Sequence, residues 1–181
     1  MRAFLPLIFL ATLAACQKDP IEVRVEPKED AAAAALAPAS RPRGVRWTAP
    51  SGWTEAPGTG MRVTTLTPPQ TAGKAEVTVI ALPGDVGGEL ANVNRWRGQL
   101  ALPPIGEADL PNARAAVRSE LGAINLYDFT GTGANKTRLV AGMFQVSGTT
   151  WFFKLMGDEK AVAAARPAFL KLLEGLQKDA S

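Results

Sequence analysis

Residues 74–82 alternate between two kinds of side chain, and this alternation constrains the fold more than any other feature of the chain. One set of positions is apolar and the other mostly polar, with Ala75, Val77, Val79 and Ala81 against Lys74, Glu76, Thr78 and Ile80. Successive side chains of a strand point to opposite faces of a sheet, so the pattern predicts a half-buried strand. Residues 61–67 are rich in β-branched side chains and stop at Pro68-Pro69. We therefore expect a hairpin in which residues 68–73 join these two strands.

Later segments extend the sheet and add two helices. Residues 122–130, 137–147 and 150–156 predict strands, and Gly148-Thr149 predicts a tight turn between the last two. Residues 89–102 predict one helix. Residues 158–176 predict another, with Asp158 as N-cap and Pro167 expected to split or kink it. This order of elements predicts an α+β domain with helices packed on an antiparallel sheet.

The first sixteen residues are interpreted as a signal for secretion and anchoring. A positive start, Met1-Arg2, precedes a short apolar stretch that closes in Leu13-Ala14-Ala15-Cys16. This arrangement is typical of a secretory signal peptide, and the apolar run is shorter than the roughly 20 residues of a membrane span. Leu13-Ala14-Ala15-Cys16 resembles the lipobox of bacterial lipoproteins, which implies a lipid on Cys16 and cleavage before it. The alternative is an ordinary secretory signal with a chance cysteine.

The expected organisation follows from this interpretation. Residues 1–15 form the signal peptide, residues 16–44 the lipidated cysteine and a disordered tether, residues 45–177 one α+β domain, and residues 178–181 a tail. The tether is expected to stay disordered because residues 17–43 carry five acidic against five basic side chains, lack aromatics and show no core-forming pattern. Gln17 stands where aspartate marks inner-membrane retention in some bacteria. The resemblance therefore implies the cell envelope, with the outer membrane, facing the periplasm, favoured over the inner membrane.

The domain itself carries a second resemblance. Pro50-Ser51-Gly52-Trp53, the hairpin, and an aromatic strand followed by residues 169–176 resemble the Mog1/PsbP-like superfamily, which includes bacterial lipoproteins and photosystem accessory proteins. Residues 87–99, together with Trp151-Phe152-Phe153-Lys154, are similar to a group of uncharacterised bacterial lipoproteins. These resemblances imply a fold but supply no activity.

The composition argues against several kinds of chemistry. The chain has no histidine, and its one cysteine is assigned to lipid, so the usual general base, thiolate nucleophile and transition-metal ligands are missing. We therefore expect no enzyme activity, no metal and no cofactor. A Ser-Lys dyad using Ser51, Ser119 or Ser147 remains as a hydrolase alternative. With 20 Lys and Arg against 17 Asp and Glu, the charge is too mild to indicate nucleic-acid binding.

The predicted helix at residues 89–102 holds most of the candidate site. At about 100° per residue, Leu90, Val93, Trp96 and Leu100 share one apolar face, and Arg97 falls inside that face. A buried guanidinium must be paired or lie against an aromatic ring, so we expect Arg97 to pair with a carboxylate or with C-terminal carbonyls inside the domain, Asp128 being the first candidate. The functional alternative is a groove lined by Asn94, Trp96 and Arg97. The candidate interaction or structural residues are Asn92, Asn94, Arg95, Trp96, Arg97, Gln99 and Trp151.

Trp151, Phe152 and Phe153 place aromatic side chains on both faces of one strand. We therefore expect at least one of them to be partly exposed or covered by a helix.

Three functions remain open. The first is a membrane-anchored accessory domain that binds an unknown envelope protein, the second a small-ligand carrier using a groove beside residues 89–102, and the third a histidine-free hydrolase. A deep apolar pocket beside Trp96 would favour the carrier, a shallow patch would favour the protein partner, and clustered carboxylates would favour the enzyme.

Overall fold

The computed structural model describes residues 44–133 and 136–179. The predicted signal peptide, Cys16 and tether, apart from Gly44, lie outside these residues. Within the described part of the chain, no helix is long and apolar enough to cross a membrane.

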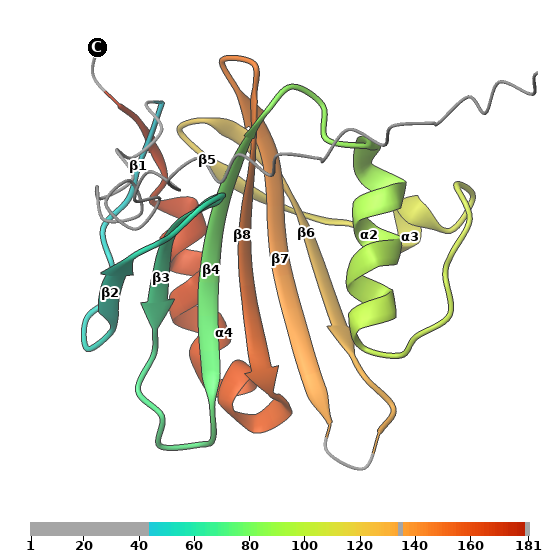
Figure 1. Ribbon diagram of the computed structural model, residues 1–181, viewed down its shortest axis with the longest axis horizontal. Coiled ribbons are helices and arrows are strands. Elements are labelled where there is room, and N and C mark those ends of the chain that lie inside the picture. The colour runs from blue at the N-terminus through green and yellow to red at the C-terminus, as the bar shows by residue number, and fades with distance from the viewer. Residues whose placement is uncertain (1–43, 134–135, 180–181) are drawn as a thin grey trace, which may run out of the picture. The chain divides into compact units, whose positions relative to one another are not determined.

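A seven-stranded antiparallel sheet organises the domain (Figure 1). Its central strands β4 and β8 pair over nine residues, from Ala75 opposite Gly157 to Pro83 opposite Thr149. The strands, in spatial order, are β2 (Thr54–Pro57), β3 (Arg62–Thr67), β4 (Ala75–Pro83), β8 (Thr149–Asp158), β7 (Thr137–Val146), β6 (Gly122–Thr130) and β5 (Ala115–Ser119). A separate two-stranded pair joins β1 (Val45–Arg46) to β9 (Gln177–Lys178).

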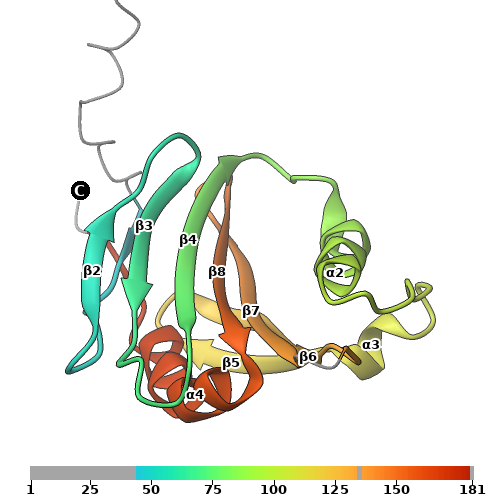
Figure 2. The ribbon, with the colours of Figure 1, turned by 60° about the horizontal axis from the view of Figure 1, so that its bottom comes forward.

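Helices cover both faces of this sheet (Figure 2). Helix α4 (Glu159–Glu174) packs on one face through Phe169, Leu172 and Leu173. Helix α2 (Gly88–Gln99) lies on the other face, with the short α3 (Leu110–Ala113) following it. The expected α+β class, with helices on an antiparallel sheet, is confirmed.

The predicted hairpins are present, with one shift. Residues 61–67 and 74–82 correspond to β3 and β4, which pair antiparallel. The turn between β7 and β8 is Ser147-Gly148, one residue earlier than predicted. Both residues have positive φ, 50° and 74°, which is the geometry of a two-residue hairpin turn that follows the twist of the strands.

Both predicted helices are present, but the effect of Pro167, the N-cap of α4 and the end of α2 differ from the prediction. Pro167 does not split α4, which is one helix from Glu159 to Glu174. An interior proline costs about 3 kcal/mol through a lost backbone hydrogen bond and a ring clash, and the burial of Phe169, Leu172 and Leu173 at about 1.5–3 kcal/mol each outweighs it. Asp158 stands at the N-cap position, but its carboxylate accepts the Lys74 N–H at 2.8 Å and caps nothing in α4. Helix α2 ends at Gln99, three residues before the predicted end.

Candidate functional site

Two asparagines of α2 hold the loops around the helix. Asn92 is buried, and its Nδ2 donates to the carbonyls of Val86 at 2.9 Å and Gly88 at 2.7 Å. Asn94 exchanges two hydrogen bonds with the backbone of Ile105, at 3.0 and 2.8 Å. Asn94 therefore fixes the segment after α2 and does not line a groove.

Arg97 does not pair with Asp128, so the first candidate for its partner was wrong. Its Nε donates to the carbonyl of Pro103 at 2.8 Å, and its guanidinium carbon lies 5.2 Å from the centre of the Phe129 ring. Phe129 and Asp128 are neighbours on β6, so their side chains point to opposite faces. Phe129 faces α2, whereas Asp128 faces α4. Arg97 is half-buried, and its partners are a backbone carbonyl and an aromatic ring rather than a carboxylate.

Asp128 instead accepts hydrogen bonds from two arginines beneath α4. Arg138 of β7 donates two, both at 2.7 Å, and Arg166 of α4 donates one at 2.9 Å. Burial alone would raise the pKa of Asp128, but the hydrogen bonds and charges of Arg138 and Arg166 outweigh burial and lower it. This cluster ties the helix to the sheet.

The tryptophans divide between the two cores. Trp96 is buried under α2, with its ring centre 5.6 Å from that of Tyr127 and 6.1 Å from that of Phe152. Helix α2 thus covers Phe152 of β8, in line with the expectation that a helix covers at least one aromatic side chain of residues 151–153. Trp151 is 0% exposed and packs against Trp47 on the α4 face. Trp151 is therefore a core residue and is not available on the surface for interaction.

A small groove of about 180 Å³ lies between α2 and the strands. We call it the α2 groove. Its lining comes from α2, β4, β8 and the residue before β3, and consists of Met61, Ile80, Leu82, Asn92, Arg95, Trp96, Gln99, Phe152 and Lys154. Met61 is 70% exposed at its rim. The structure therefore brings together four of the predicted site residues, Asn92, Arg95, Trp96 and Gln99.

Lys154 is the functional candidate that the sequence reasoning missed. It is half-buried on β8, and its Nζ donates to the side-chain oxygen of Gln99 at 3.2 Å. Burial lowers the pKa of Lys154, nearby Arg62 lowers it further, and Glu76 opposes them. Its position in the sequence could have indicated it, because Lys154 lies two residues from Phe152 and therefore on the same face of the strand.

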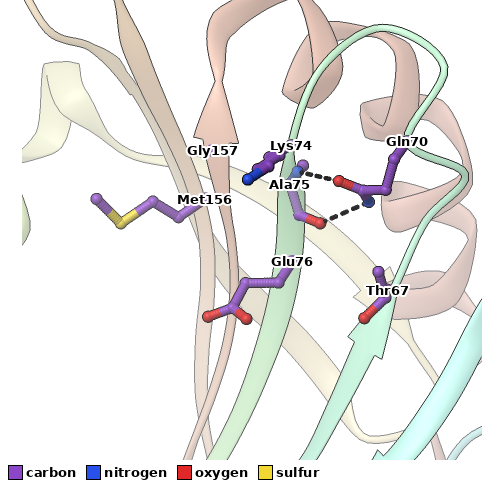
Figure 3. A pocket seen from close by; sticks show the side chains of 7 residues that line it. All are labelled: Thr67, Gln70, Lys74, Ala75, Glu76, Met156 and Gly157. Atoms are coloured by element: carbon purple, nitrogen blue, oxygen red, sulfur yellow. Dashed lines mark hydrogen bonds between the residues drawn. The ribbon is translucent and has the colours of Figure 1, made fainter.

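A second hollow of about 450 Å³ lies at the far end of β4 and β8 (Figure 3). Glu76 and Met156 line it from the strand face that also carries Ile80 and Lys154. Its most prominent polar side chain, Gln70, is committed to the backbone: Nε2 donates to the carbonyls of Pro68 and Ala75, and Oε1 accepts the Ala75 N–H. The other polar side chains of its lining are Thr67, Lys74 and Glu76.

In the described part of the chain, neither Ser51 nor Ser119 forms a hydrogen-bonded pair with a lysine. Ser51 and Lys171 line one hollow of about 510 Å³, but no hydrogen bond joins them. The Ser119 hydroxyl is engaged with the backbone of Leu121 and Gly122. No group of three Asp, Glu, His or Cys side chains lies close enough to hold a metal ion in residues 44–133 and 136–179.

Comparison of the sequence with models of known protein families and with curated proteins finds no match. Among solved structures, the chain is similar to a protein from Bacteroides thetaiotaomicron VPI-5482, with 8% identity and a TM-score of 0.49 over 76% of this chain and 46% of that one. It thus spans about half the length of that protein.

Two further structures cover more of their own chains. LpqN, involved in cell envelope biogenesis of Mycobacterium tuberculosis, has 14% identity and a TM-score of 0.48 over 75% of this chain and 83% of that one. Cyanobacterial PsbP from Synechocystis sp. PCC 6803 has 16% identity and a TM-score of 0.48 over 75% and 86%. A PsbP protein is thus among the similar structures. At these scores, the α+β class rests on the chain's own sheet and helices.

Proposed function

We propose that this chain is a lipid-anchored accessory protein of the cell envelope, held on the outer membrane through Cys16, that binds another envelope protein through the α2 groove without catalysing a reaction. The anchor is supported by the sequence of residues 13–16. The observation that carries the binding role is the groove itself: a small apolar floor, an exposed methionine and two cations at the rim.

The dimensions of the groove favour a protein partner over a carried ligand. Pockets for small molecules typically enclose about 300–1,000 Å³ and bury most of the ligand, whereas the α2 groove measures about 180 Å³. Protein interfaces instead use small pockets that receive single anchor side chains, often surrounded by near-neutral contacts. The groove fits this second description.

Photo-crosslinking in living cells tests the proposal. A photoreactive amino acid at Gln99, which is exposed at the groove, should give one discrete protein adduct on irradiation. The matched control places the same amino acid at Glu174, which is exposed on α4 on the other side of the sheet. The same adducts from both positions, or none from Gln99, would contradict a binding role for the groove.

A further inference from the structure

We infer that the α2 groove recognises an acidic linear segment of its partner, with one apolar side chain on the groove floor and neighbouring carboxylates at Arg95 and Lys154. This inference rests on the proposed function and specifies the chemistry of the partner.

The charge of the groove is one-sided. Arg95 stands on the α2 wall and Lys154 on the β8 wall, and none of the nine lining residues is acidic. Arg95 is exposed and forms no ion pair within the described residues. Lys154 donates a hydrogen bond to the neutral side chain of Gln99, and Glu76 acts on its charge without bonding to it. Two cations on opposite walls, neither of them hydrogen-bonded to a carboxylate, are complementary to a segment that carries acidic side chains.

The nearest opposing charge is already engaged beyond the groove. Glu76 lies 3.7 Å from Arg62, measured between Oε1 and Nη1. A partner's carboxylates would therefore meet Arg95 and Lys154 without displacing an internal ion pair of either residue.

The apolar floor limits what else can enter. Ile80, Leu82, Trp96 and Phe152 contribute it. A volume of about 180 Å³ lies below the range of about 300–1,000 Å³ typical of small-molecule pockets, so the floor suits an anchor of the size of one side chain.

An unpaired acceptor favours a peptide over other carboxylates. Both donors of the Asn92 amide are used by the carbonyls of Val86 and Gly88, while its Oδ1 is buried and has no partner. Leaving such an atom unpaired costs about 1–3 kcal/mol. A peptide supplies backbone N–H donors beside its side chains, which is the kind of group that this oxygen lacks.

Selection from a phage-displayed library of random twelve-residue peptides tests the inference on the full-length chain in detergent. We expect enrichment of peptides in which Asp or Glu flank Leu, Ile or Phe. A selected peptide should bind Arg95→Glu about tenfold more weakly, because a rim attraction becomes a repulsion. Lys154→Gln should also weaken binding. Arg118→Glu makes the same charge change at an exposed position of β5 and should leave the affinity unchanged.

The outcomes separate the two proposals. No enrichment, enrichment without acidic residues, or equal binding to Arg95→Glu and wild type overturns the acidic-segment inference. If Gln99 still gives its discrete adduct in cells, the binding role of the groove stands without it. If that adduct is absent, the proposed function itself fails.

Discussion

Arg97 shows how this domain keeps a charge at the edge of its core without a carboxylate. One hydrogen bond to the Pro103 carbonyl and the face of the Phe129 ring compensate the guanidinium. The first contact joins α2 to the segment that follows it, and the second joins α2 to β6 of the sheet. The charge therefore stabilises the position of the helix.

Replacing Arg97 with methionine should lower the free energy of unfolding by about 1–2 kcal/mol. The variant keeps the apolar stem but loses a charge-assisted hydrogen bond and a cation–π contact. Urea denaturation measures the change. Arg118→Met, at an exposed position with no partner in the described residues, should stay within about 0.5 kcal/mol of wild type. Equal stability of the two variants would show that the Arg97 contacts contribute nothing.

Asp128 makes the free energy of unfolding depend on pH in the acid range. Its pKa is lowered from 3.8, so its interactions with Arg138 and Arg166 are fully present above that value and are lost as the pH falls through the lowered pKa. Asp128→Asn should cost about 1–3 kcal/mol near neutral pH, because two arginines lose their shared carboxylate. The difference from wild type should shrink as the pH falls below 3.8 and through the lowered pKa.

Unfolding curves at several pH values measure this convergence. Asp109→Asn removes an exposed carboxylate that has no side-chain partner among the described residues, and should show no comparable pH dependence. A difference between Asp128→Asn and wild type that stays constant into acid would contradict the assignment.

At the scale of elements, α4 approaches the sheet closely at one glycine. A Cβ built on Gly142 of β7 would lie 3.0 and 3.1 Å from the two methyl carbons of Leu173 and 3.2 Å from Ile124 Cγ2. Leu173 is fully buried, so little room remains for it to move away. This glycine sets the spacing between helix and strand.

Gly142→Ala should therefore destabilise the fold by about 1–3 kcal/mol through overpacking. Gly98→Ala is the matched substitution in α2, where nothing lies within 4 Å of the added carbon. That variant should gain up to about 1 kcal/mol, because alanine favours a helix more than glycine does. Thermal or urea denaturation compares the two, and a neutral Gly142→Ala would mean that α4 can shift outward at little cost.

The long strands could be predicted from the sequence, whereas the short edge strands could not. Strands β4, β6, β7 and β8 have nine or ten residues and show their pattern clearly. The four residues of β2 are all exposed, and only Val117 of β5 is buried, so neither shows an alternation. These edge strands form because the neighbouring strand offers unpaired backbone N–H and C=O groups. The sequence of the edge strand itself does not indicate this pairing.

The candidate site divides in the same way. The apolar face of α2 could be predicted, since Val93, Trp96 and Leu100 are all buried. The partner of Arg97 could not, because the sequence does not say which face of β6 meets α2. Lys154 was missed for a related reason: alternation assigns it to one face of β8 but does not show that this face stays partly uncovered.

At the scale of the whole molecule, the predicted anchor is tested by Cys16→Ala. The wild-type chain should incorporate labelled palmitate and appear in the outer-membrane fraction, because more than one acyl chain holds a soluble domain stably. The variant should lose the label and accumulate as the longer precursor. Gln17→Asp keeps the cysteine, so it should retain the label while moving toward the inner-membrane fraction. Label on Cys16→Ala would contradict the assignment.

The pairing of β1 with β9 has a mechanical consequence. Residue 44 is where any pull on the preceding chain enters the domain, directly before Val45, which pairs with Lys178. Such a pull loads the outermost contacts first, the Asp179 N–H to the Gly44 carbonyl and then the Val45 pair, before it reaches the Arg46–Gln177 side-chain bond of 2.6 Å. Tension would thus act on this two-residue ribbon and on the buried side chains of Val45 and Trp47 before it reached the long strands β4, β8 and β7.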